Sequence, residues 1–66
     1  MPNDDDAKFE DALKKLEKIG GRFTPARMDA RRTNWRNQGD YKLGRKTLLD
    51  TAERQVRIAD ALALKE

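Results

Sequence analysis

Apolar residues recur at helical spacing in the first third of the chain, and this pattern narrows the possible folds more than any other feature. Phe9, Leu13 and Leu16 lie three or four positions apart and therefore share one face of an α-helix. Aspartates at positions 4–6 suit the positive end of a helix dipole, and Gly20 and Gly21 are typical helix-ending residues. The sequence therefore predicts a helix over about residues 4–19.

Two further helices are predicted from their start and stop residues. Thr24 followed by Pro25 is a typical helix start, and Gly39 a typical stop, which predicts a helix over about residues 25–38. Thr47, with Asp50 three positions later, forms a variant capping box and predicts a third helix over about residues 47–64, after a linker at 40–44. We therefore expect one all-α domain over residues 1–66, folded as a small three-helix bundle.

The core of such a bundle is thin. The chain has 66 residues and no cysteine, so neither size nor disulfides add much stability, and helix packing or association must supply it. The end of the 47–64 helix is apolar around most of its circumference, which is typical of a helix with two neighbours. A homodimer through this helix is one arrangement that would cover both sides. Its expected interface, for a second copy or another partner, is Val56, Ile58, Ala59, Leu62 and Leu64.

Positive charge is concentrated in the middle of the chain. The formal net charge is only +3, but eight basic and two acidic residues lie between positions 22 and 46, and the flanking segments are mildly acidic. The cations of the 25–38 helix are all arginine, whose planar fork matches phosphate oxygens two at a time. The expected nucleic-acid-binding residues are Arg27, Arg31, Arg32, Arg36, Lys42, Arg45 and Lys46.

Arg45 and Lys46 stand directly ahead of the predicted 47–64 helix. Cations there oppose the helix dipole, whereas a bound phosphate would be favoured by both the dipole and the cations. We therefore expect an anion at this position. The segment from Gly39 to Thr47 resembles a nucleotide-binding loop only superficially, because Arg45 interrupts the required Gly-Lys-Thr sequence and no strand precedes it.

These features favour a small nucleic-acid-binding protein, binding DNA more readily than RNA, with a regulatory or accessory role. Trp35 would either pack in the core or stack on a base. The alternative is a protein-interaction module, such as an adaptor, inhibitor or antitoxin, that docks its basic helix on an acidic partner surface. Association of the 25–38 helix with a membrane surface is a weaker third interpretation, since that helix has few large apolar residues.

Several classes of function are not expected. The chain has no histidine, cysteine or serine, so the common nucleophiles and the usual neutral-pH base are missing and we expect no enzyme activity. Helix capping accounts for the aspartates at positions 4–6, and we expect neither a metal nor a cofactor. No apolar run reaches the roughly 20 residues that span a bilayer, and the acidic first residues are unlike a signal peptide, so a cytoplasmic protein is expected.

Overall fold

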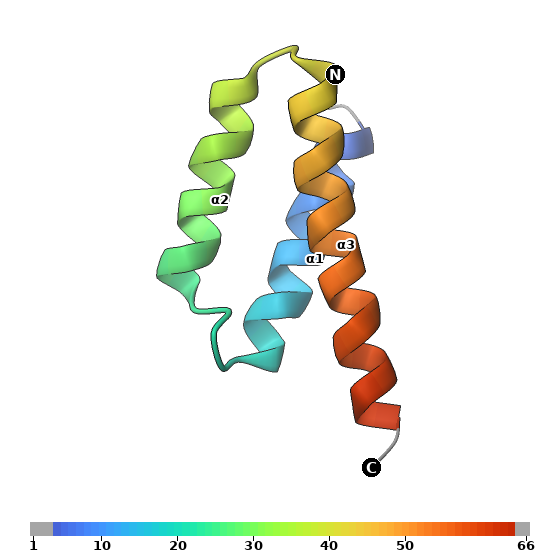
Figure 1. Ribbon diagram of the computed structural model, residues 1–66. Helices are drawn as coiled ribbons and strands as arrows, with labels where there is room; N and C mark the ends of the chain where they lie inside the picture. The colour runs from blue at the N-terminus through green and yellow to red at the C-terminus, as the bar shows by residue number, and fades with distance from the viewer. Residues whose placement is uncertain (1–3, 65–66) are drawn as a thin grey trace.

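Three α-helices form the whole of the regular structure in the computed structural model, which describes residues 4–64 and the side chains of residues 4–62. They are α1 (Asp4–Ile19), α2 (Pro25–Gln38) and α3 (Lys42–Leu64). α1 and α3 run in the same direction side by side, and α2 runs antiparallel to both (Figure 1). The predicted all-α three-helix bundle is confirmed.

The first two helices begin and end where the sequence predicts. Gly20 and Gly21 both have positive φ, at 80° and 63°, so the chain leaves α1 through backbone conformations that favour glycine. Thr24 caps α2, because its hydroxyl oxygen accepts a hydrogen bond from the backbone N–H of Arg27 at 3.3 Å. Gly39, with φ of 55°, ends α2.

The third helix begins five residues earlier than predicted, and the expected linker at 40–44 is wrong. α3 starts at Lys42, and the N–H of Arg45 already donates to the carbonyl of Tyr41 at 3.1 Å. Thr47 is therefore an interior residue whose hydroxyl donates to the Leu43 carbonyl at 3.0 Å. Gly44 lies in the first turn of α3, beside the end of the flexible Gln38 side chain, and does not break the helix.

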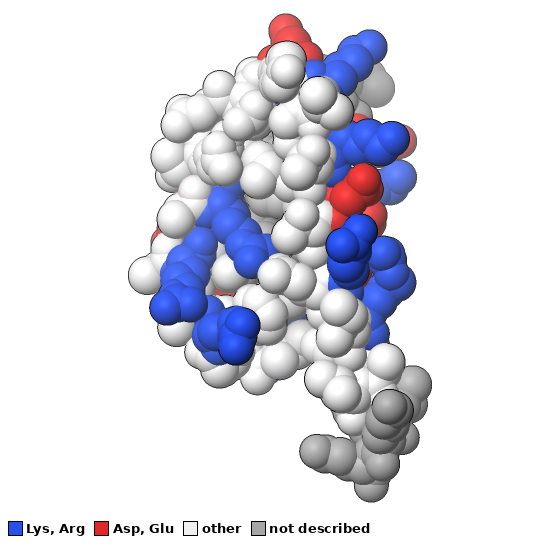
Figure 2. Space-filling view, viewed as in Figure 1, with Lys and Arg blue, Asp and Glu red and all other residues white. Residues whose placement is uncertain are grey.

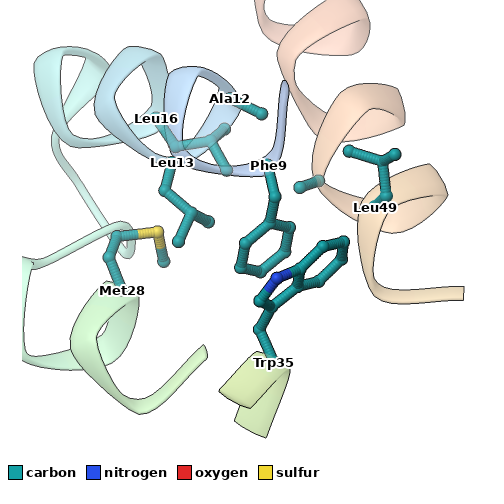
Figure 3. Close-up of a cluster of buried hydrophobic side chains, with 8 residues drawn as sticks. Phe9, Ala12, Leu13, Leu16, Met28, Trp35 and Leu49 are labelled. Atoms are coloured by element: carbon teal, nitrogen blue, oxygen red, sulfur yellow. The ribbon is translucent and has the colours of Figure 1, made fainter. Parts of the chain in front are cut away.

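The core lies where the three helices meet (Figure 3). Phe9 of α1 and Trp35 of α2 stack with ring centroids 4.2 Å apart and planes inclined by 12°. Leu13 and Met28 pack beside them, and Leu49 closes the core from α3. The buried residues are Phe9, Ala12, Leu13, Leu16, Met28, Trp35, Leu49 and Ala52.

The bundle is elongated, with principal extents of 40 × 20 × 20 Å. α3 is the longest helix, and its C-terminal part reaches past the loop that joins α1 to α2 (Figure 1). Within the described part of the chain, none of the helices combines the length and apolar character that crossing a bilayer requires.

Candidate functional site

Arg32, one of the expected phosphate-binding residues, is held by carboxylates of its own chain. Its guanidinium donates to both oxygens of Glu10, to Glu17 at 2.9 Å and to Asp29 at 2.6 Å. The side chain is 21% exposed. The hydrogen bonds with Glu10, followed by those with Asp29 and Glu17, raise the pKa of Arg32 above its ordinary value despite partial burial. These bonds use most of the N–H groups of the guanidinium, so a phosphate at Arg32 would compete with three carboxylates.

Arg45 is likewise engaged within the fold. Its Nη1 lies 3.0 Å from Oδ1 of Asp6, and its guanidinium carbon lies 4.8 Å from the Trp35 ring centroid. The same Asp6 oxygen accepts a hydrogen bond from Trp35 Nε1 at 2.7 Å. Trp35 is only 6% exposed, so of its two expected roles the structure confirms packing in the core.

The other arginines of α2 lie on two sides of the helix. Arg31 points toward α3, where its Nη1 donates to Oε1 of Gln55 at 2.7 Å. Arg27 lies one turn before Arg31 on the same side and is exposed. Arg36 follows Arg32 by one helical turn and therefore lies on the same side of α2, toward α1. Its Nη2 donates to the Thr33 hydroxyl at 3.4 Å. The expected cations therefore do not share one face.

Partial burial lowers the pKa of Arg31, which distinguishes it from Arg32. Its hydrogen-bond partner, Gln55, is neutral, and no ion pair to Arg31 is found among the described residues. Arg31 is thus a partly buried cation that forms no ion pair with a carboxylate of the described residues.

The expected anion site at the start of α3 has mixed charge. A hollow at this end of the bundle is lined by both signs of charge: Asp5, Gly39, Asp40, Lys42, Arg45, Lys46 and Leu49. Because α3 begins at Lys42, Arg45 and Lys46 lie inside the helix and not ahead of it, contrary to the prediction. Lys42 and Lys46 are exposed, and two carboxylates share their hollow.

A second hollow combines exposed apolar side chains with arginine. It lies between the α1–α2 loop and the C-terminal half of α3 and has a volume of about 500 Å³. We call it the loop groove. Its lining is Ile19, Arg22, Phe23, Gln55, Ile58, Ala59 and Leu62.

Three of the residues expected at an interface line this groove. Ile58 is 53% exposed and Leu62 is 60% exposed, while Ala59 is half-buried at the base of the same helix face. Val56 instead packs against the core. The side chain of Leu64 lies outside the described residues.

Basic side chains gather in two separate groups on the face shown in Figure 2. One group covers the loop end of α2, the other follows the outer edge of α3, and an uncharged band lies between them. Arg22 lines the loop groove, Arg31 is bonded to a groove residue, and Arg27 lies beside Arg31. We call Arg22, Arg27 and Arg31 the rim arginines.

Sequence reasoning missed two features of this surface. It assigned Asp6 to capping, although the side chain also holds Trp35 and Arg45, which are 29 and 39 positions away. It did not identify Arg22 as a site residue, although Arg22 follows the helix-ending glycines and immediately precedes Phe23. Phe23, a large apolar residue beside Arg22 in a short loop, was the sequence feature that could have indicated an apolar surface at this loop.

Comparison of the chain with known protein families, with curated proteins and with solved structures gives no match. Among the residues that the structure describes, no three histidine, cysteine, aspartate or glutamate side chains are grouped so that they could hold a metal ion. The loop groove and the charges around it are therefore the features of the described surface that bear on function.

Proposed function

We propose that this protein is a non-enzymatic interaction module that binds another protein through the loop groove. The observation that carries the proposal is the placement of half-exposed Ile58 and Leu62 one helical turn apart, in a hollow beside the rim arginines. Contiguous exposed apolar surface next to polar side chains is typical of interaction sites. Arginine is also one of the residue types that contribute most to the binding energy of protein interfaces.

The internal arginines support a protein partner over a nucleic acid. Arg32 and Arg45 were two of the seven expected phosphate ligands, and both are paired with carboxylates. The remaining cations lie on different sides of the bundle, so a single straight duplex would meet only part of them. We therefore keep the alternative of a protein-interaction module. Its proposed contact surface is now the loop groove and not the basic helix α2 alone.

Site-specific photocrosslinking in cells that express the protein tests this proposal. A photoreactive phenylalanine analogue at Leu62 is expected to yield a discrete crosslinked protein, because this position lines the groove. The matched position is Asp50, which is exposed on the same helix but is not a groove residue. Absence of a protein adduct at Leu62, or equal yield at both positions, would overturn the proposal.

Nucleic-acid binding is the second candidate, favoured by the rim arginines, which lie together at the loop end of α2 without ion pairs among the described residues. If they contact duplex phosphates, the logarithm of the binding constant should fall with the logarithm of salt concentration by about 0.9 for each phosphate neutralised. Fluorescence anisotropy with a labelled duplex measures this slope. Replacing Arg27 with Gln should reduce the slope by about one unit.

A further inference from the structure

We propose that the occupant of the loop groove is an acidic amphipathic helix of a partner protein. This inference rests on the proposed function and adds the chemistry of the partner. The partner helix would place apolar side chains against Ile58 and Leu62 and carboxylates against Arg22 and Arg31.

The apolar part of the groove matches the stripe of an amphipathic helix. Ile58 and Leu62 are separated by four positions, Ile19 ends α1 beside them, and half-buried Phe23 comes from the loop. Three chain segments thus line one open hollow. Peptide helices that bind such grooves insert apolar residues at positions i, i+3 or i+4, and i+7.

The charge around the groove selects a negative partner. Of the described residues that line it, Arg22 is the one charged side chain, and none is a carboxylate. Arg31 adjoins the groove through Gln55 and is a partly buried cation that forms no ion pair among the described residues. A carboxylate from a partner would supply the missing ion pair, as Glu10 and Glu17 do for Arg32.

Other occupants fit these features less well. In a two-fold dimer the same patch on both copies forms the interface, and the lining of this patch has Arg22 and no carboxylate to pair with it. A nucleic acid would satisfy the arginines but would leave the apolar surface of Ile58 and Leu62 without an apolar partner.

A displayed peptide library provides the test. The library consists of 16-residue helices with a fixed leucine stripe and random polar residues at the flanking positions, selected against the intact 66-residue protein. We expect glutamate and aspartate to be enriched at the flanks of the selected peptides. A selected peptide, synthesised with a fluorescent label, should bind at least tenfold more weakly when its acidic residues are replaced by glutamine.

Variants of the protein locate the binding site. Arg22→Gln with Arg31→Gln should weaken the selected acidic peptide at least tenfold, and Ile58→Gln with Leu62→Gln should abolish its binding. The matched control is Lys15→Gln with Arg57→Gln, which removes two charges from the opposite hollow between α1 and α3 and should leave affinity unchanged. Circular dichroism confirms that each variant is folded.

The outcomes separate this inference from the proposed function. The selected peptides could instead have neutral or basic residues at their flanks while their binding still requires Ile58 and Leu62. That result would overturn the inference that the partner is acidic, but it would support the proposal that the groove binds a protein. Failure to select any peptide that depends on these two residues would overturn this inference, whereas the proposed function is overturned only if crosslinking at Leu62 also gives no protein adduct. If Ile58→Gln with Leu62→Gln converts a dimer to a monomer in sedimentation, the occupant is a second copy and the inference is wrong. Competition by a DNA duplex that requires the same two residues would overturn it as well.

Discussion

At the scale of single residues, arginine has two opposite roles in this protein. Arg32 is surrounded by three carboxylates from α1 and α2, and it therefore joins these helices by charge as well as by packing. Arg31, the preceding residue, donates to neutral Gln55 of α3 and has no ion pair among the described residues. The two side chains have the same chemistry, but only Arg32 is neutralised by carboxylates within the fold.

Arg32→Ala should lower the free energy of unfolding by about 1–2 kcal/mol, because several charge-assisted hydrogen bonds are lost and three carboxylates remain together. Arg32→Lys should recover only part of this loss, since an ammonium group cannot reproduce the planar fork that meets both oxygens of Glu10. Urea denaturation followed by circular dichroism measures both variants. Arg36→Ala is the control, because this exposed side chain makes one long contact, to Thr33. If the Arg32 and Arg36 substitutions lower the free energy of unfolding equally, Arg32 does not stabilise the contact between α1 and α2 through its carboxylate partners.

Asp6→Ala should destabilise the protein by about 1–2 kcal/mol, since both Trp35 Nε1 and Arg45 lose their acceptor. Asp6→Asn should be milder, because an amide oxygen still accepts from the indole. Asp4→Ala tests the general effect of removing a carboxylate from the same helical turn. Urea unfolding curves, with near-ultraviolet circular dichroism of Trp35, give the comparison. If Asp4→Ala lowers the free energy of unfolding as much as Asp6→Ala does, Asp6 contributes only by compensating the helix dipole.

At the scale of elements, helix starts depend on more than capping residues. Thr24 and Thr47 both look like N-caps in the sequence, yet only Thr24 acts as one. The predicted start of α3 is wrong because Thr47 and Asp50 resemble a capping box, although Thr47 lies inside the helix and its hydroxyl donates to the Leu43 carbonyl. The helix begins earlier, where the N–H of Arg45 already donates to the Tyr41 carbonyl, and no local capping pattern marks that start. Helices with strong apolar stripes and terminal glycines, such as α1, were predictable for the opposite reason, since their determinants are local.

Thr24→Ala should lower the free energy of unfolding by about 1 kcal/mol, because the N–H of Arg27 loses its acceptor. Thr47→Ala should be neutral or slightly stabilising, since alanine is the better residue within a helix. Both threonines are exposed, so burial does not differ between the two substitutions. Thermal or urea unfolding of the pair measures the difference. A larger loss at Thr47 would contradict a helix that begins at Lys42.

At the scale of the whole molecule, stability rests on a small core. Domains below about 70–80 residues rarely obtain more than about 3–5 kcal/mol from one hydrophobic core. The stacked Phe9 and Trp35 rings and the fully buried leucines of α1 supply most of the apolar contact here. The loss of one large buried side chain is therefore comparable with the stability of the entire fold.

Leu16→Ala should lower the free energy of unfolding by about 2–5 kcal/mol and leave much of the protein unfolded at 37 °C. Ile19→Ala, one turn later on the same helix, should change it far less, because Ile19 is 48% exposed whereas Leu16 is fully buried. Differential scanning calorimetry compares the two variants. Similar melting temperatures for both would mean that the groove end of α1 belongs to the core.

The candidate site was less predictable than the fold. Local sequence indicated the abundance of arginine and the apolar end of α3, including Ile58 and Leu62. It did not indicate which arginines the fold would pair internally, because Arg32 meets Glu10 and Glu17 only after α1 and α2 have packed. Nor did it indicate that Arg22 from a loop would line the same hollow as Leu62 from the end of α3. Both facts are products of tertiary arrangement.

The parallel course of α1 and α3 has a consequence for the order of folding. The bond from Arg45 to Asp6 joins residues 39 positions apart, with all of α2 between them. A contact of such long range is favourable only after the intervening loops have closed, so we expect it to form late, after α2 has packed on a neighbouring helix. Arg45→Met should then accelerate unfolding more than it slows refolding in stopped-flow measurements. The contact between α1 and α3, the most extensive of the three helix pairs, would then be completed last.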